Sequence, residues 1–341
     1  GFLIVFRTSQ AYSRFWDGCT ATHKMRAEWF DACSSIMAFT KHATASYEKV
    51  LVFQHTLVRL FSMLHALALA EIEDCNSEEL ENVSAFSYEL IDAASIDAGS
   101  LQSIKTSNSK VELVFQWIQQ LVVVNISTGV LAIPAPILSR SFQELANGMV
   151  EFHDAFKISS IPFPFPYAQT CDCLLALHWI GTPFVICQWV YTPWWAFVLS
   201  FVQVFILWCL NFIAVEIENP FGDDANDIDA ASMQEEMNRH LMMLLQPETQ
   251  RIPSLVVRDD TSEKELTEEE LHNLTFCRKS FSSTWDAMDA HCARTCRGGR
   301  RTSFGVANRR SSLVCAAAIV AGSDAGDSGV AVHHTSSAYS C

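Results

Sequence analysis

A long stretch without any charged side chain most restricts what this 341-residue chain can fold into. Over residues 173–215, 43 consecutive positions contain no Asp, Glu, Lys or Arg. A helix needs about 20 apolar residues to cross a hydrocarbon core ~30 Å thick, and each half of the stretch has about this length. Between the halves, Thr192-Pro193 interrupts the helix, because proline donates no backbone hydrogen bond. The sequence therefore predicts a helical hairpin that crosses a membrane and returns.

Aromatic side chains beside the predicted turn agree with a membrane location. Trp189, Tyr191, Trp194 and Trp195 cluster there, and such amphipathic rings favour the headgroup zone of a bilayer. A hairpin buried inside a large soluble protein is the alternative interpretation. Basic residues that flank the apolar segments place the bulk of the chain on the cytosolic or stromal side, by the positive-inside rule.

Several other segments have the pattern of amphipathic helices that pack in a bundle. Apolar residues recur at helical spacing over 27–39, 50–70 and 111–133, whereas the polar residues 71–110 predict a loop or insertion. A further helix is expected from residue 230, with Asp229 as its cap. The predicted fold class is therefore an all-α membrane protein with spanning helices and a helical bundle.

The composition changes near residue 253, which divides the chain into two parts. Up to about residue 218 the chain is rich in Phe, Trp, Leu and Val, while residues 254–341 are polar and have no periodic order. The second part therefore predicts a disordered C-terminal tail. The chain opens with GFLIVF, which has the pattern of an apolar helix cut in half, so we expect that a preceding segment is missing.

Charge and motifs exclude several classes of function. The net charge is −15, which argues against a nucleic-acid partner because such proteins need a basic surface. The 12 cysteines include no CxxC pair, so no zinc pattern is present. The sequence contains no Gly-rich phosphate loop, HExxH or GxSxG. We expect no enzyme, no catalytic residues and no required cofactor.

The acidic stretch EIENPFGDDANDID, at residues 216–229, follows the uncharged region directly. Its residues allow three interpretations. It can be a helix end followed by a new helix start, a cation site, or a run of solvated charges. The residues alone leave these three open.

Three motifs in order resemble those of the bestrophin family of anion channels. They are FRTSQAYSRFWDG (6–18), IPFPFPYAQ (161–169) and EIENPFGDDANDID (216–229). The resemblance covers residues 1–253, and it implies a pentameric, mostly α-helical channel with four spanning helices per subunit and a cytosolic helical region. It also implies passive conduction of chloride, with bicarbonate among the permeant anions. The partners implied are membrane lipid, further copies of this chain and small anions.

The resemblance also implies positions for the residues that line the pore. Counting back from Arg14 places the apolar neck of the pore at Phe6 and, one turn earlier, at Phe2. The second constriction, a pore aperture, falls on Ile137. Arg7 follows the neck, where its charge would attract anions; an ion pair with Glu216 or Glu218 is the alternative.

By the same resemblance, the acidic stretch corresponds to the calcium clasp of the animal members. Asn219 matches the residue that offers a backbone carbonyl, while Asp224 and Asp227 match two carboxylate ligands. Calcium needs 6 to 8 oxygen ligands, so these residues alone are too few. The alternative is a turn, permitted by Gly222 and followed by a helix cap.

The uncharged hairpin and the resemblance to the bestrophin family together predict a homopentameric chloride channel subunit. A non-conducting structural subunit with the same fold, docked in a larger complex, is the alternative function. The similarity of IPFPFPYAQ to members from photosynthetic organisms favours a chloroplast thylakoid or other plastid membrane over the plasma membrane.

Overall fold

The computed structural model describes residues 1–73, 88–222, 226–253, 256–259 and 262–265. The chain divides into two compact units, Gly1–Ser254 and Leu255–Cys341. In the second unit, the described residues form an antiparallel hairpin of β1 (Val256–Asp259) and β2 (Ser262–Glu265), in which Val256 pairs with Glu265. The hairpin falls in the predicted tail, most of which lies outside the described residues.

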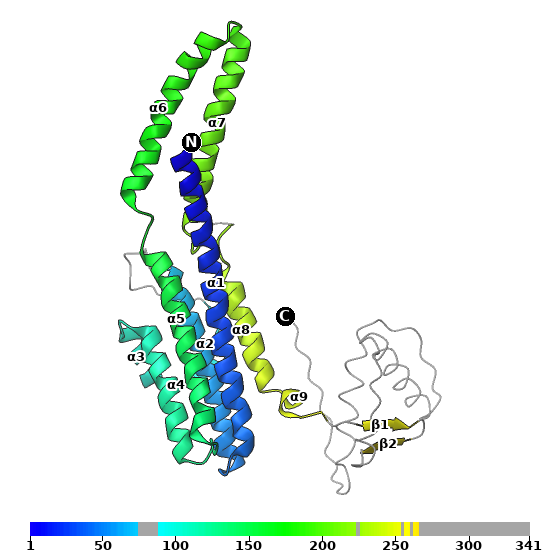
Figure 1. The fold of residues 1–341 in the computed structure, drawn as a ribbon. Coiled ribbons are helices and arrows are strands. Elements are labelled where there is room, and N and C mark those ends of the chain that lie inside the picture. Colours follow the sequence, from blue (N-terminus) through cyan, green and yellow to red (C-terminus); the bar gives the residue numbers. More distant parts are fainter. Residues whose placement is uncertain (74–87, 223–225, 254–255, 260–261, 266–341) are drawn as a thin grey trace, which may run out of the picture. The chain divides into compact units, whose positions relative to one another are not determined.

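The described part of the first unit is helical, which confirms the predicted fold class (Figure 1). Its longest helix, α1 (Phe2–Phe39), has 38 residues. In Figure 1 the start of α1 lies beside α7, and its second half runs down into the bundle. The other members of this bundle are α2 (Tyr47–Glu73), α3 (Ala98–Thr106), α4 (Lys110–Ser127), α5 (Ala135–Ser160) and α8 (Ala230–Leu244). Short elements complete the unit: η1 (Thr40–His42), η4 (Ala93–Ser95) and α9 (Pro247–Gln250).

A close approach of α1 and α5 forms the centre of the bundle core. The indole of Trp29 is fully buried and its Nε1 donates to the carbonyl oxygen of Leu145 at 3.3 Å. The ring lies where a side chain at Gly148 would stand, since an added Cβ would be 2.4 Å from its Cδ1 and Nε1. Gly148 therefore sets how closely the two helices pack.

A buried polar network joins α2 to α8. His65 Nδ1 lies 2.7 Å from Gln234 Oε1, and Ser62 donates to Asn238 Oδ1 at 2.6 Å. The Gln234 amide in turn donates to the Ser62 carbonyl at 3.1 Å. Burial lowers the pKa of His65 to about 4, because desolvation disfavours the charged imidazolium. The network therefore holds a neutral histidine in the core.

The predicted hairpin is present as α6 (Phe165–Trp189) and α7 (Pro193–Glu218). The break falls at residues 190–192, as the sequence indicates. Three helices in the described part of the chain are long and apolar enough to span a bilayer, but 67% of the apolar window of α2 is buried, against 11% in α6 and 17% in α7. Thus α2 contributes to the bundle core, and the unburied helices α6 and α7 are the ones suited to lipid.

Two element boundaries differ from the sequence-based expectation. The residues 71–110 contain the short helix α3, whose N-cap Asp97 accepts a hydrogen bond from the Ser100 backbone N–H at 2.8 Å. Helix α4 ends at Ser127 instead of residue 133, because Gly129 adopts a positive φ of 78°. The carbonyl oxygen of Gly129 accepts a hydrogen bond from the Thr44 N–H at 2.9 Å.

Candidate functional site

The three sequence motifs meet where α1, the α5–α6 connection and the end of α7 come together. Gly18, the last residue of the first motif, lies against the third. A Cβ on Gly18 would be 3.0 Å from Pro220 Cγ and 3.1 Å from Phe221 Cζ. A larger residue would force the turn after α7 away from α1. We refer to this meeting point of the motifs as the junction.

Arg14 connects two helix ends at the junction. Its Nε donates to the carbonyl oxygen of Glu218 at 2.9 Å, at the end of α7. Its Nη2 donates to the carbonyl oxygen of Ile161 at 2.6 Å and to that of Ile158. The last carbonyls of a helix have no partner within the helix, and a cation near them interacts favourably with the helix dipole. Arg14 therefore satisfies carbonyls at the ends of α5 and α7.

Arg7 lies two turns earlier on α1 and is 6% exposed. Its Nη1 donates to Asn211 Oδ1 at 3.0 Å, and its Nη2 donates to Glu218 Oε2 at 3.3 Å. The carboxylate of Asp172 is 3.7 Å from Nη1, and the guanidinium carbon lies 5.8 Å from the centroid of the Phe163 ring. One cation is thus surrounded by groups from α6, α7 and the second motif.

This environment bears on the two interpretations of Arg7. The ion pair with Glu218 is present, and among the described residues the partners of Arg7 do not include Glu216. With two carboxylates within 4 Å of the guanidinium, the charge of Arg7 is compensated inside the subunit. Attraction of anions by Arg7 stays a prediction that this pairing does not favour.

The predicted neck residues lie on an exposed face of α1. Phe2 is 81% exposed and Phe6 is 39% exposed, and they are one turn apart on the helix. The Phe6 ring lies 6.3 Å from that of Tyr167 on α6. The same face continues with the exposed residues Gln10, Ser13 and Asp17, which help to line a crevice of about 420 Å³ beside the start of α6. Along this face of α1, the apolar rings of Phe2 and Phe6 are thus followed by three polar side chains.

Ile137 lies in the first turn of α5 and is 51% exposed. Helix α5 joins α6 at its C-terminal end (Figure 1), so its first turn lies at the end of the bundle far from the hairpin. The predicted neck and the predicted aperture are therefore at opposite ends of the unit. Both roles stay predictions, since they depend on neighbouring subunits.

The acidic stretch forms a turn and a helix cap in its described part. The Asn219 amide donates to the Phe221 carbonyl oxygen at 3.2 Å, and the Ile228 N–H donates to the Pro220 carbonyl oxygen at 3.0 Å. The Asp229 carboxylate accepts from the Ser232 N–H at 2.9 Å and caps α8, which confirms that prediction. Asp227 lies close to Gly222, where an added Cβ would be 2.7 Å from its Oδ2.

Of the three predicted calcium ligands, Asp224 lies outside the described residues. Of the two predicted carboxylate ligands, the structure therefore describes only that of Asp227. Within the same described part of the chain, no group of three or more His, Cys, Asp or Glu residues could hold a metal ion. Calcium binding at Asn219, Asp224 and Asp227 therefore stays a prediction, and no step of the function is derived from it.

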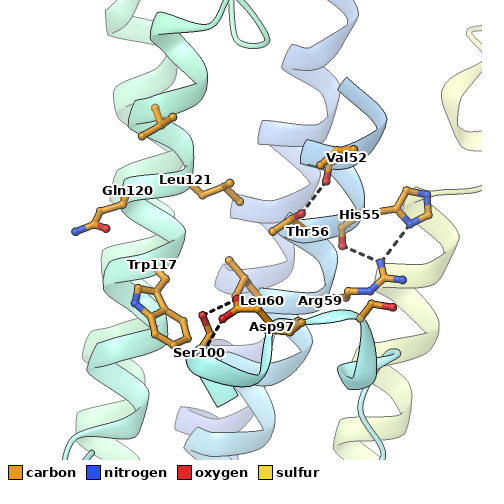
Figure 2. A pocket seen from close by; sticks show the side chains of 13 residues that line it. Val52, His55, Thr56, Arg59, Leu60, Asp97, Ser100, Trp117, Gln120 and Leu121 are labelled. Carbon is orange, nitrogen blue, oxygen red and sulfur yellow. Dashed lines mark hydrogen bonds between the residues drawn. The ribbon is translucent and has the colours of Figure 1, made fainter. Parts of the chain in front are cut away.

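A groove in the bundle is a feature that the sequence did not predict. It has a volume of about 720 Å³ and lies between α2 and α4, with the α3 region at one end (Figure 2). Its walls combine the Trp117 and Leu121 side chains with the polar Thr56 and Gln120. Arg59, at its edge, pairs with Asp92 at 2.6 Å. Helical periodicity assigns these residues to a bundle but does not show that two helices leave a space between them.

The family of the chain follows from comparison with known proteins. A family model described as bacterial/fungal bestrophin protein matches residues 1–243. The chain belongs to the bestrophin family. This bestrophin is 28% identical over 253 residues to a voltage-dependent anion channel-forming protein of Nostoc, covering 71% of this chain and 73% of the relative. It is 29% identical over 250 residues to a protein of the same description from Synechocystis, with coverages of 72% and 74%.

The fold of this bestrophin is also that of solved members. A crystal structure of a bacterial bestrophin homologue from Klebsiella pneumoniae superposes with a TM-score of 0.60 at 14% identity. The superposition covers 74% of this chain and 84% of that one. A mutant of the same homologue gives a TM-score of 0.58 at 15% identity, with coverages of 71% and 82%. These structures share the fold of the described helices, and α6 and α7 are the long, apolar and largely unburied helices in it. Membership of the bestrophin family makes the chain a membrane protein with the character of a channel.

Proposed function

We propose that this chain is a subunit of a passive anion channel, with chloride as the main permeant ion. The match of residues 1–243 to the bestrophin family carries this proposal. Two relatives that are described as voltage-dependent anion channel-forming proteins, each aligned over more than two thirds of both chains, add to it. The exposed apolar surface of α6 and α7 provides the contact with lipid.

The arrangement of α1 supports a narrow neck in an oligomer of five subunits. If five copies of α1 face a common axis, Phe2 and Phe6 contribute two stacked apolar rings. Such rings can exclude water and thereby gate the pore. The edges of aromatic rings carry partial positive charge, so these rings also stabilise a passing anion. Ile137 contributes a third apolar ring, the second constriction, at the far end of the bundle.

This proposal does not assign the selectivity to Arg7. The guanidinium is buried and paired with Glu218 and Asp172, so its charge is largely compensated at the pore surface. Selectivity then depends on the aromatic edges at the neck and on the polar residues that follow them. Calcium at the acidic stretch is a separate proposal: a calcium-dependent current that Asp227→Asn abolishes would support it, and a calcium-independent current would reject it.

The source of the relatives indicates the membrane in which the proposed channel works. The two relatives come from Nostoc and Synechocystis, and the second motif is similar to that of members from photosynthetic organisms. A thylakoid or other plastid membrane is therefore proposed ahead of the plasma membrane. Immunogold labelling or membrane fractionation of the source cells tests this location.

Reconstitution tests the channel function directly. The full-length protein is inserted into liposomes loaded with a chloride-sensitive dye, and an imposed chloride gradient is expected to dissipate through it. Empty liposomes and liposomes with gluconate in place of chloride are the controls. The absence of anion flux, together with particle images that show asymmetric incorporation into a larger complex instead of five-fold rings, would favour the non-conducting structural subunit.

A further inference from the structure

We infer that Glu218, at the end of the spanning hairpin, holds α1, the helix of the proposed neck, in position. Arg7 and Arg14 are the two residues of α1 that bind Glu218. This inference rests on the proposed channel function, because it concerns how the neck helix is positioned. In this role Arg7 and Arg14 are positioning residues that do not contact the permeant anion. We call the contact of the two arginines with Glu218 the fastening.

The two arginines bind the same residue in different ways. Arg7 donates to the Glu218 side chain at 3.3 Å, and Arg14 donates to the Glu218 backbone carbonyl at 2.9 Å. They are seven residues apart, which is about two turns of an α-helix, so both can face α7. Since Glu218 is the last residue of α7, the fastening fixes the end of the hairpin against α1.

Further contacts extend the fastening along both spanning helices. The Asn211 side chain accepts from Arg7 at 3.0 Å and donates to Asp172 on α6 at 3.3 Å. One turn of α1 is therefore connected to α6 and α7 through a single amide. The Thr8 hydroxyl adds a hydrogen bond to the Leu210 carbonyl oxygen at 3.3 Å.

Burial makes the pair of Arg7 and Glu218 sensitive to the loss of one partner. The Arg7 side chain is 7% exposed and that of Glu218 is 20% exposed, whereas that of Asp172 is 60% exposed. Removal of one partner of a buried pair leaves the other charge uncompensated, and this is strongly unfavourable. An exposed partner contributes much less, because solvent screens its charge. Glu218 is therefore the carboxylate on which the position of Arg7 depends.

The fastening lies directly behind the proposed neck. Phe6 precedes Arg7 in the chain, and Phe6 is on the exposed face of α1 while Arg7 is on the buried face. Side chains on the buried face hold this part of α1 to the rest of the subunit. The positions of the Phe2 and Phe6 rings in the pore are therefore set by Arg7 and Glu218.

Four variants of the full-length protein test the inference: Arg7→Gln, Glu218→Gln, the double variant and Glu216→Gln. We expect each of the first two to reduce the chloride current per reconstituted channel on the order of tenfold. Glu218→Gln leaves the buried Arg7 with only the exposed Asp172 nearby, and Arg7→Gln removes the cation that pairs with the partly buried Glu218 carboxylate. The double variant is expected to lose no more than the more impaired single variant. Glu216→Gln is the matched control, because Glu216 is an exposed carboxylate near the same end of α7 and is not among the partners of Arg7 in the described part of the chain. It is expected to change the current less than about threefold.

Two further readouts separate positioning from other roles. Hydrogen exchange of backbone amides 5–14 in detergent is expected to be faster in Arg7→Gln and Glu218→Gln, and unchanged in α8. The chloride-to-sodium permeability ratio of the double variant is expected to stay within about twofold of the unmodified channel, because both charges of the pair are removed together and the net charge beside the neck is unchanged.

Three results would overturn the inference. Losses of current that multiply in the double variant would show that Arg7 and Glu218 act independently. Unchanged hydrogen exchange in residues 5–14 would show that the pair does not hold α1. A changed permeability ratio at normal current would assign Arg7 to anion attraction. If the unmodified protein conducts no anions, the channel function fails, while hydrogen exchange still decides whether the fastening exists.

Discussion

Replacement of Gly148 by alanine tests the packing of α1 against α5. The added Cβ would lie 2.4 Å from Cδ1 and Nε1 of Trp29, whereas carbon atoms prefer about 3.5–4.0 Å. One helix or the ring must therefore move by about 1 Å. Trp29 is fully buried, so no open space receives it, and its hydrogen bond to Leu145 is disturbed by such a movement.

The expected change in stability follows from three contributions. Overpacking a core costs about 1–3 kcal/mol, and a weakened hydrogen bond adds about 0.5–1.5 kcal/mol. Alanine favours the helix over glycine by about 0.5–1 kcal/mol. Gly148→Ala is therefore expected to lower the free energy of unfolding by about 1–3 kcal/mol. In a unit of this size, each kcal/mol corresponds to about 2–4 °C in the thermal midpoint.

Thermal unfolding in detergent, followed by circular dichroism at 222 nm, measures this change. Gly181→Ala is the matched control, because Gly181 is also helical but has no heavy atom within 4 Å of an added Cβ. The control is expected to keep or slightly raise the midpoint. If Gly148→Ala and Gly181→Ala behave alike, the contact between Trp29 and Gly148 is not a packing restraint and the reasoning is wrong.

The remaining predictions concern the neck, a helix cap and a buried histidine. Phe6→Ala and Phe2→Ala are expected to change anion permeability ratios, measured from reversal potentials, whereas Phe205→Ala on the exposed surface of α7 leaves them unchanged. Ratios that stay at the unmodified value in all three variants would place Phe2 and Phe6 outside the pore. Asp229→Ala removes the N-cap of α8 and is expected to lower the thermal midpoint by the equivalent of about 1 kcal/mol. Asp229→Asn is the control, because asparagine also caps a helix. His65 has its pKa lowered to about 4 by burial, so the unfolded chain binds its proton first, and stability falls as pH decreases from about 6.5 to about 4. A midpoint that does not change between pH 7 and pH 4.5 would contradict this.

Much of the fold could be predicted because its signals are local. The break near Pro193 and the cap at Asp229 depend on residues within one turn of each other, and both are where the sequence indicates. By contrast, the sequence patterns present residues 6–18 and 27–39 as separate segments, although α1 is one helix from Phe2 to Phe39. Gly18 does not interrupt it, because Pro220 and Phe221 pack against the position that lacks a side chain.

The site could be predicted only in outline. The motifs indicate which residues matter, but Arg7 and Glu218 are 211 positions apart, and no periodic pattern relates residues at that separation. The resemblance leaves the ion pair of Arg7 open as an alternative, and only the packing of α7 on α1 decides that it forms. The groove between α2 and α4 could not be predicted either, because it also depends on how helices distant in the sequence pack.

Because α1 is long, a small change in its angle moves its first residues by a large distance. With a rise of about 1.5 Å per residue, Phe6 lies about 18 Å from Gly18, the position at which α1 meets the turn after α7. If α1 and the hairpin that Arg7 and Arg14 hold to it tilt together by about 5° around this point, Phe6 is displaced sideways by about 1.5 Å. In the proposed ring of five subunits, the same tilt in every subunit would widen the opening by about 3 Å, which is about the diameter of a water molecule. A small rotation of this kind would then wet or dry the proposed neck without any change in its side chains.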